Sequence, residues 1–372
     1  MAKTVLILGG SFAGLHVAHA LLKKNDKDIK VVLVTKCDHL YWNMAAVRAI
    51  VPGVIKDEDI FKSIPSALER YPKDSYELII GTAKATNFET KTVEVETISA
   101  DGTRSLSYDQ LVLATGARCP TTDVPWKASG SYEEIKTLLH QSAEKTKAAQ
   151  HIVVAGGGPT GVETAGELGY EWGKTKKIVL LCSDTKLANG DITGPAALNE
   201  LKKLNVEVKF SSKVTDASPT ADGKQTKITL ASGESLTTNL YLPTMGLVPN
   251  SEYIPIKYLT DRKTVDVDEF LKVKGTENVW AAGDLISKPR AGFMITQKQA
   301  AGVAKNVELA VKGKPPVVAK GMPMDIFAMS VGRGRGAGRM GSFKMPSLMV
   351  WLAKGRTLAL QMAPGYVDGS VA

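Results

Sequence analysis

The 372-residue sequence has few cysteines and no paired ones. Cys37, Cys119 and Cys182 are the three present, they form no CxxC pair, and no Cys/His cluster has the spacing of metal ligands. This pattern argues against a disulfide scaffold and against a structural zinc site. It also lacks the dithiol motif of a disulfide-exchanging enzyme. We therefore expect free thiols and no metal centre.

Long apolar runs are absent from the beginning of the sequence. Residues 5–8 form a short apolar stretch that stops at Gly9, too short for a signal-peptide core or a membrane span. Ala2 stands where N-myristoylation requires glycine. The sequence therefore predicts a cytoplasmic protein that is not secreted, with peripheral membrane contact left as an option.

The composition is that of a globular protein with more than one domain. Hydrophobic residues make up 44% and charged residues 23% of the chain, and its length predicts two or three domains. The formal net charge is +9. Such an excess favours anionic partners, which include nucleotide phosphates, nucleic acid and an acidic membrane surface.

Two segments of the sequence share the pattern strand, glycine-rich turn, helix, strand. In the first, an apolar β-branched run at 4–8 is followed by a turn at 9–14, a helical stretch at 15–24 and a strand at 29–35. In the second, the corresponding residues are 151–155, 156–161, 162–172 and 177–182. The pattern predicts an α/β protein with two Rossmann-like dinucleotide-binding domains.

The two turns supply what a diphosphate needs: backbone N–H donors at a helix start, with little side chain in the way. The second turn fits the GxGxxG pattern completely, whereas the first has serine at the middle position. A tight turn without a ligand is the alternative for each. The candidate cofactor-binding residues of the turns are Gly9, Gly10, Ser11, Gly14, Gly156, Gly158, Thr160 and Gly161.

The acidic residue that usually binds ribose at the end of the second strand is missing from both segments. The first has Thr35 and Lys36 there, and the second has Cys182 and Ser183. Lys36 is suited to a phosphate, and Ser183 tolerates a 2′-phosphate. We therefore favour NADPH slightly and keep NADH as an alternative.

The rest of the chain divides into an insertion, a return segment and a distinct C-terminal part. Residues 76–112 indicate a three-stranded insertion, with Asp101-Gly102 as a hairpin turn. A strand at 278–282 and a helix at 297–312 are expected to return the chain to the first domain. The last 52 residues hold 7 of the 11 methionines and a net charge of +4, which indicates a separate, small α+β module.

Five motifs, taken in their order along the chain, resemble the two-dinucleotide-binding-domain flavoproteins: the first turn, the Ala114-Thr115-Gly116 segment, the second turn, the segment 245–250 and the segment 281–284. The resemblance implies an FAD-binding domain at 1–120 and 247–320, an NAD(P)H-binding domain at 121–246 and a C-terminal module at 321–372. It also implies that Asp284 binds the ribitol and diphosphate of FAD. The further cofactor-binding residues are Ala114, Thr115, Gly116, Gly246, Gly283 and Asp284.

The segment 41–49, together with 329–333 and 348–356, is similar to the apoptosis-inducing-factor-like flavoproteins, the group of the ferroptosis-suppressor proteins. That group looks like type II NADH dehydrogenases and reduces quinones with NAD(P)H. The resemblance implies that Asn43 and Arg48 contact the flavin or its diphosphate, and that Glu163 and Lys354 are catalytic. A surface charge is the alternative for Arg48, and stabilisation of a helix start is the alternative for Glu163.

Because the segment 41–49 contains no cysteine, electrons are expected to leave the flavin directly for a small acceptor, either a quinone or oxygen. The predicted enzyme is an NAD(P)H:quinone oxidoreductase. A redox-sensing NAD(P)H-binding interaction protein and a pathway-specific tailoring flavin oxidoreductase are the alternatives. A homodimer is an oligomeric state that the sequence allows.

Two segments of the C-terminal part bear on partners. The apolar run 348–352 predicts a short helix, which we expect to be buried against the FAD domain, with membrane or quinone-tail contact as the alternative. The Arg-Gly stretch 332–339 is short and lacks aromatic residues, so we do not expect nucleic-acid binding.

Overall fold

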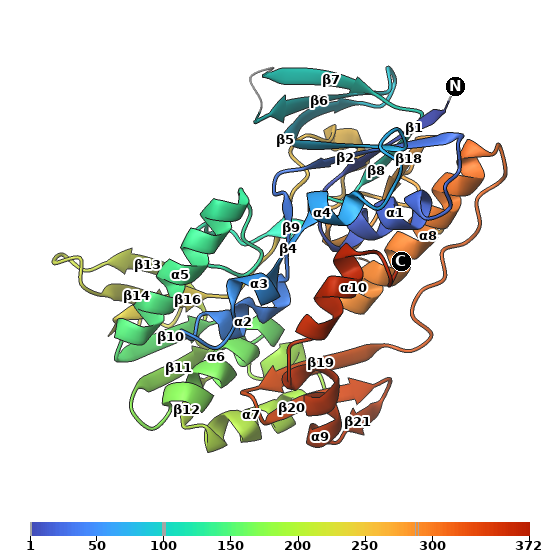
Figure 1. Cartoon of the computed structure of the whole chain (residues 1–372). Helices are drawn as coiled ribbons and strands as arrows, with labels where there is room; N and C mark the ends of the chain where they lie inside the picture. Colours follow the sequence, from blue (N-terminus) through green and yellow to red (C-terminus); the bar gives the residue numbers. More distant parts are fainter. Residues whose placement is uncertain (1, 99–101, 287, 289) are drawn as a thin grey trace.

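The computed structural model describes residues 2–98, 102–286, 288 and 290–372 of the chain. Two sheets form separate layers of the molecule, and the C-terminal segment, drawn in red, lies against both (Figure 1). We call the larger sheet with its helices the first domain and the smaller parallel sheet with its helices the second domain.

The first domain is built on a seven-stranded sheet. The five strands from the edge strand β18 to β5 are parallel, and β6 and β7 continue the sheet in antiparallel fashion. The strand order is β18 (Val279–Ala281), β8 (Gln110–Leu113), β1 (Lys3–Leu8), β2 (Ile29–Thr35), β5 (Tyr76–Asn87), β6 (Thr92–Thr97) and β7 (Thr103–Ser107).

Alternate residues of β1 are buried in different cores, as expected for a strand covered on both faces. Val5 and Ile7 pack in the core that holds α1 (Phe12–Leu22) and α8 (Phe293–Val311). Leu6 and Leu8 pack in the core that includes residues from 253–286, the segment containing η3 (Ile256–Tyr258) and η4 (Gly283–Leu285). The sequence predicted the return of the chain to this sheet through β18, and the structure confirms it.

The insertion is confirmed as a meander of β5, β6 and β7, but it extends the main sheet and does not form one of its own. Asp101 of the predicted hairpin turn lies outside the described residues. A second, smaller excursion follows β2. It contains the ribbon of β3 (His39–Tyr41) with β4 (Phe61–Ser63) and the short helices η1 (Asn43–Ala45), α2 (Ala46–Ala49), α3 (Asp57–Ile60) and α4 (Ile64–Leu68).

The second domain has a parallel four-stranded sheet of order β12 (Val206–Lys209), β11 (Lys177–Leu181), β10 (His151–Ala155) and β16 (Leu240–Pro243). Val153 and Val179 on one face pack against the small antiparallel sheet of β13 (Val214–Pro219), β14 (Thr226–Leu230) and β15 (Ser235–Thr238). The helices of this domain are α5 (Tyr132–Ala148), α6 (Pro159–Trp172), η2 (Leu187–Gly190) and α7 (Gly194–Lys203).

The chain passes between the two domains through a short antiparallel ribbon. It pairs β9 (Ala117–Arg118), which leaves the first domain, with β17 (Val248–Pro249), which returns to it. Each strand has two residues, so the ribbon joins the two domains closely.

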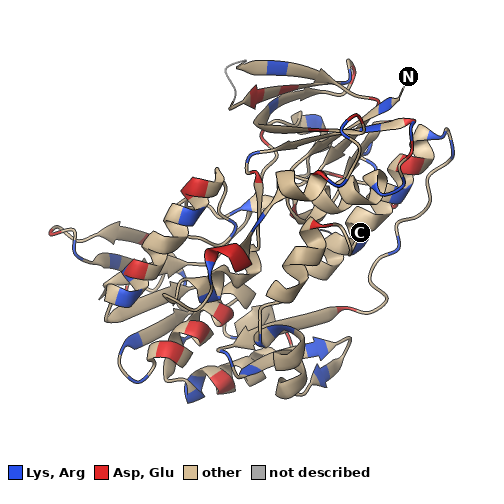
Figure 2. Ribbon diagram, in the orientation of Figure 1, with Lys and Arg blue, Asp and Glu red and all other residues tan. Residues whose placement is uncertain are grey.

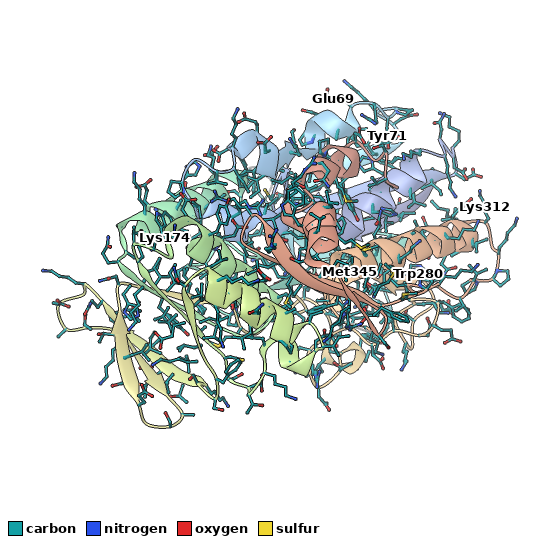
Figure 3. All side chains as sticks on the ribbon, turned by 90° about the horizontal axis from the view of Figure 1, so that it is seen from below. Glu69, Tyr71, Lys174, Trp280, Lys312 and Met345 are labelled. Carbon is teal, nitrogen blue, oxygen red and sulfur yellow. The ribbon has the colours of Figure 1, made fainter. Side chains whose placement is uncertain are left out.

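The C-terminal part is an α+β module, as predicted, but it is not separate from the rest of the molecule. Its strands β19 (Ile326–Val331) and β20 (Arg335–Met340) pack on α6 and α7 of the second domain. Beyond them come β21 (Phe343–Met345), α9 (Ser347–Val350), the π-helix η5 (Trp351–Gly355), η6 (Leu360–Met362) and α10 (Ala363–Val367). The last helix, α10, packs on α1 and β4 of the first domain, so this module contacts both domains (Figure 3).

A glycine pair allows the close contact between α6 and the turn after β19. A Cβ atom built on Gly166 would lie 2.7 Å from the backbone nitrogen of Gly332, a separation that no side chain tolerates.

At the far end of the module, the ammonium group of Lys23 donates to the carbonyl of Ala372 at 2.9 Å. The guanidinium group of Arg70 donates to the carbonyl of Asp368 at 2.6 Å.

The prediction for the apolar run 348–352 was half right. The helix is present as α9 and continues into η5, but the run is not buried against the first domain. Val350 packs on Gly336 and Gly338 of β20 in its own module, whereas Leu348 and Leu352 are 58% and 56% exposed. Helices of 18 or more residues with the apolar character of a membrane span do not occur among the described residues.

Candidate active site

A cavity of about 550 Å³ opens at the carboxyl ends of the parallel strands β1, β2, β8 and β18. This is the edge at which parallel α/β sheets bind nucleotides, and the volume is that of a cofactor site. We call it the first-domain cavity. The predicted site residues in its lining are Gly9, Gly10, Ser11, Thr35, Lys36, Asn43, Ala114, Thr115, Gly116, Gly283 and Asp284.

The glycine turn after β1 has the geometry of an anion cradle. Gly9 has a φ of +109°, and a Cβ atom on Gly14 would lie 1.8 Å from the carbonyl oxygen of Gly9, so Gly14 shapes the turn without lining the cavity. Ser11 is the N-cap of α1, and its side chain makes no capping hydrogen bond. The start of α1 therefore points its backbone donors at the cavity.

The end of β2 supplies a hydroxyl and a lysine in place of a carboxylate. Thr35 lies against Gly10, where an added Cβ would be 2.6 Å from the threonine side chain, and its hydroxyl donates to the Cys37 carbonyl at 2.9 Å. Lys36 is exposed at the cavity rim. This end of the cavity is therefore neutral to positive.

Two motifs that are far apart in the sequence bind each other in the structure. The Thr115 hydroxyl donates to the Asn250 carbonyl at 2.8 Å, and the Asn250 side-chain amide donates back to the Thr115 carbonyl at 2.8 Å. Arg118 donates to the Asn250 side chain at 2.7 Å. The segment after β17 thus fixes the turn after β8 beside the cavity.

Sequence reasoning missed several lining residues that follow no recognised motif. Among them are Lys84, Arg118, Lys127, Tyr253 and Thr296. They come from different parts of the chain, among them Lys84 on β5 and Thr296 on α8. Lys127 lies two residues after Pro125 in the inter-domain linker, and the sequence around it gives no sign of a role at the cavity.

The turn after β10 repeats the first turn closely. Gly156 has a φ of +123°, and a Cβ atom on Gly161 would lie 1.8 Å from the Gly156 carbonyl oxygen, the same distance as between Gly14 and Gly9. The backbone N–H of Gly9 donates to the Val34 carbonyl of β2, and that of Gly156 donates to the Leu181 carbonyl of β11, each at 2.8 Å. Gly158 is the N-cap of α6. Thr160 follows in the first turn of the helix.

The other two residues predicted to bind the second nucleotide, Ser183 and Gly246, follow the neighbouring strands β11 and β16. Ser183 is exposed after β11, and its hydroxyl donates to Asp184 at 3.3 Å. Gly246 is exposed after β16 with a φ of +75° and faces Pro120. The first carboxylate after the end of β11 is thus that of Asp184, which is exposed.

Glu163 and Lys354 are 191 positions apart in the sequence and form an ion pair. Lys354 Nζ lies 2.6 Å from Glu163 Oε1, with the two side chains 25% and 7% exposed. The same carboxylate oxygen accepts from the backbone N–H of Ser330 at 2.9 Å, and Lys354 Nζ donates to the Ala328 carbonyl at 3.1 Å. The pair therefore links the start of α6 to the C-terminal module.

Arg48 is absent from the residues that line the first-domain cavity, and its expected contact with the flavin stays a prediction. Its Nε donates to Glu167 at 2.8 Å, and its two terminal nitrogens donate to the carbonyls of Arg356 at 3.0 Å and Gly355 at 2.7 Å. The reason is that α2 packs on α6, so Arg48 faces the second domain. Burial raises the pKa of Glu167, and Arg48 and Arg333 oppose this rise.

Two of the three arginines of the Arg-Gly stretch 332–339 form ion pairs within the molecule. Arg333 pairs with Glu167 at 3.3 Å and with Glu171 at 2.8 Å, and Arg339 pairs with Asp191 and Asp325, both at 2.7 Å. Figure 2 shows that β20 and β21 both carry basic residues. The stretch is therefore an ordered hairpin and not a flexible basic tail.

The cysteines do not supply a redox pair near the cavity. Cys37 lines the cavity, and burial raises its pKa to about 11, which keeps it a neutral thiol. All three cysteines are free in the part of the chain that is described, and that part contains no group of His, Cys, Asp and Glu suited to a metal ion.

Comparison with known proteins agrees with this geometry. Residues 3–311 match the family described as pyridine nucleotide-disulphide oxidoreductase. The chain belongs to this family. The family is FAD-dependent and uses pyridine nucleotides, so the predicted fold, the cofactors FAD and NADH or NADPH, and oxidoreductase activity are confirmed. The disulphide chemistry in the family's name has no cysteine pair to support it here.

Three relatives show how far the likeness extends. "Oxidoreductase ptaL" of Pestalotiopsis fici is 39% identical, covering 99% of this chain and 100% of the relative. Human "Ferroptosis suppressor protein 1" is 27% identical, covering 96% and 94%. The sulfide:quinone oxidoreductase structure from Aquifex aeolicus has a TM-score of 0.77 at 16% identity, covering 100% and 93%.

The residues of the first-domain cavity fit FAD. The Gly9 to Gly14 cradle with the start of α1 suits its diphosphate, and Asp284 with the Thr115–Asn250 pair lies at the strand ends where the rest of the cofactor extends. The second turn, which has the same glycine geometry, suits the nicotinamide nucleotide.

Proposed function

We propose that this protein is an NAD(P)H:quinone oxidoreductase that passes electrons from reduced flavin directly to a quinone-type acceptor. When bound, FAD supplies the chemistry by accepting a hydride from NAD(P)H and giving two electrons to the acceptor. The overall reaction consumes NAD(P)H, one proton and a quinone and yields NAD(P)⁺ and a hydroquinone.

The Glu163–Lys354 ion pair is the observation that carries this proposal. It joins the helix that starts at the nicotinamide turn to the C-terminal module, and the lysine side chain is still 25% exposed. An ammonium group held by a carboxylate is a fixed hydrogen-bond donor for a carbonyl oxygen. We assign Lys354 Nζ to the acceptor oxygen, and Glu163 to holding that donor in place.

The lack of a cysteine pair supports direct transfer to a small acceptor. In the described residues, Cys37 is the one cysteine that lines the cavity, and its thiol is neutral. A dithiol relay needs two cysteines within bonding distance. The acceptor must therefore come to the flavin itself.

We further propose that the C-terminal module rests on a membrane surface, from which a hydrophobic quinone can be drawn. In this proposal, six exposed apolar side chains of the module make up one apolar patch, and the basic residues of β20 and β21 lie on the same module (Figure 2). The patch consists of Met324, Met340, Phe343, Leu348, Met349 and Leu352. An apolar patch beside cations suits an acidic bilayer surface.

The deciding experiment is anaerobic reduction of the bound flavin by NADH or NADPH, followed by mixing with short-chain quinones or with oxygen. We expect bleaching of the flavin by either nucleotide and rapid reoxidation by a quinone. A purified protein that binds no FAD, or whose reduced flavin no quinone reoxidises, contradicts the proposal.

A second candidate is a tailoring oxidoreductase that acts on another small molecule. It is compatible with the 39% identity to "Oxidoreductase ptaL", whose name gives oxidoreductase activity without naming a quinone, and this identity exceeds the 27% to human "Ferroptosis suppressor protein 1". In the same experiment, reduction of the flavin by NAD(P)H without reoxidation by any quinone in the panel selects this candidate.

A further inference from the structure

Lys127 occupies a backbone position that favours glycine. It lies in a turn in which the Ala128 N–H donates to the Pro125 carbonyl at 3.3 Å, and its φ is +55°. At this third position of a turn, a positive φ is usually provided by glycine or asparagine. A lysine there is held in a less favourable backbone conformation, which suggests that its side chain has a role.

Buried hydrogen bonds fix the turn from both domains. The Tyr41 hydroxyl of the first domain donates to the Pro125 carbonyl at 3.0 Å. The Trp126 ring N–H donates to the Pro243 carbonyl of the second domain at 2.8 Å, and the Cys119 thiol donates to the Trp126 carbonyl at 3.1 Å. The direction of the Lys127 side chain is therefore set by its surroundings.

The side chain enters the first-domain cavity and pairs with Asp284. The two side chains are 28% and 14% exposed, and both line the cavity. Two other cations of the lining are paired with other carboxylates, Arg118 with Glu252 and Lys84 with Glu96. The Lys127 ammonium group is thus directed to the one carboxylate predicted to meet the cofactor.

Charge balance in the cavity requires a cation at this place. A diphosphate brings two negative charges to the end of the sheet where Asp284 already carries one, and like charges repel strongly where water is partly excluded. The backbone donors at the start of α1 offset only part of this charge.

We propose that Lys127 is an FAD-binding residue whose ammonium group neutralises Asp284 and the diphosphate of the cofactor together, and that the left-handed backbone serves to aim it there. The inference rests on FAD as the cofactor, but it does not depend on which acceptor is reduced.

Lys127→Gly separates this role from a structural one. Because glycine adopts a positive φ without strain, we expect the melting temperature of the FAD-free variant to lie no more than about 2 °C below that of the wild type. The dissociation constant of FAD, measured by quenching of flavin fluorescence, should rise about tenfold or more with loss of a charge-assisted bond. It should also become less dependent on ionic strength.

Two further variants complete the test. Lys127→Arg keeps the charge and should bind FAD within about threefold of the wild type. Lys91→Gly is the matched control, because Lys91 has the same φ of +55° but is exposed and lies outside the cavity lining, so FAD binding should not change.

The proposal is overturned if Lys127→Gly binds FAD as the wild type does with the same dependence on ionic strength. It is also overturned if weak binding appears only together with a large loss of stability of the FAD-free protein. If the glycine variant does not fold, Lys127→Gln is measured in its place, with the same two outcomes. Because the assay contains neither nicotinamide nor acceptor, failure of the quinone reductase proposal leaves it intact.

Discussion

Arg48 Nη2 lies 2.7 Å from Glu167 Oε1, with the two side chains 5% and 0% exposed. The pair joins α2 of the first domain to α6 of the second, and the same guanidinium group holds two carbonyls of the C-terminal module. Glu163 lies one helical turn before Glu167 on α6, and Lys354 immediately precedes Gly355. This buried pair therefore holds the same elements that carry the proposed catalytic pair.

Arg48→Met is expected to destabilise the protein strongly. Removing one partner leaves the buried Glu167 charge without its main cation, at a cost of about 3–5 kcal/mol. The melting temperature of the FAD-loaded protein measures this. Arg48→Met/Glu167→Leu should recover part of the loss, and additive losses from the two single variants would contradict a direct coupling.

Lys354→Met should reduce the quinone half-reaction and spare the nucleotide half-reaction. Loss of the hydrogen-bond donor is expected to lower kcat with quinone about 100-fold. Anaerobic reduction of the flavin by NAD(P)H should change by less than about threefold. Stopped-flow absorbance at the flavin band measures both rates.

Lys344→Met, on the exposed strand β21, is the matched control for this experiment and should behave as the wild type. Equal losses in both half-reactions of Lys354→Met would instead indicate that the lysine supports the fold of the site. Lys354→Arg should recover part of the quinone rate, because it retains a charged donor.

Ser183→Asp should shift the nucleotide preference to NADH. A carboxylate at the end of β11 binds the ribose hydroxyls of NADH and repels the 2′-phosphate of NADPH. We expect kcat/KM for NADPH to fall about 10–100-fold, with an equal or higher value for NADH. The ratio of the two values in steady-state assays is the measurement, and an unchanged ratio places the ribose elsewhere.

Stability should fall as the pH is lowered from 6.5 towards 4 because of His16. Burial, with a smaller effect of Lys23, lowers the pKa of His16 to about 4. The unfolded chain then binds a proton between these pH values that the folded chain excludes, so acid favours unfolding. His16→Leu should reduce the drop in melting temperature over this range, and the buried His19, whose pKa burial also lowers to about 4, should retain part of it.

The apolar patch can be tested with acidic vesicles. Phe343→Glu/Leu352→Glu should abolish cosedimentation of the protein with phosphatidylserine vesicles, since two charges replace two of the three most exposed apolar side chains of the patch. Ile98→Glu is the control, because Ile98 is 69% exposed and follows β6 on the first domain, away from the C-terminal module. Binding that survives the double variant contradicts the proposed membrane contact.

The local motifs allowed much of this molecule to be predicted. The turn at Gly9 and the turn at Gly156 are determined by residues within a few positions, and for this reason their matching geometry could be anticipated. The return of β18 to the first sheet also followed from the sequence pattern.

What depended on contacts between distant segments could not be predicted. The direction of Arg48 depends on the packing of α2 on α6, and the sequence near Arg48 contains no sign of this. In the same way, the exposure of Leu348 and Leu352 depends on how β20 accepts Val350. Lys127 was missed because its role depends on Asp284, 157 positions later.

The path of the C-terminal module has a consequence for how the chain matures. Arg48 leaves the ribosome long before Gly355 and Arg356, whose carbonyls it binds. These contacts and the Glu163–Lys354 pair can form only after the C-terminal module has been synthesised. Completion of the site therefore waits for this module, and the surface of α6 that the module covers stays exposed on the nascent chain until then.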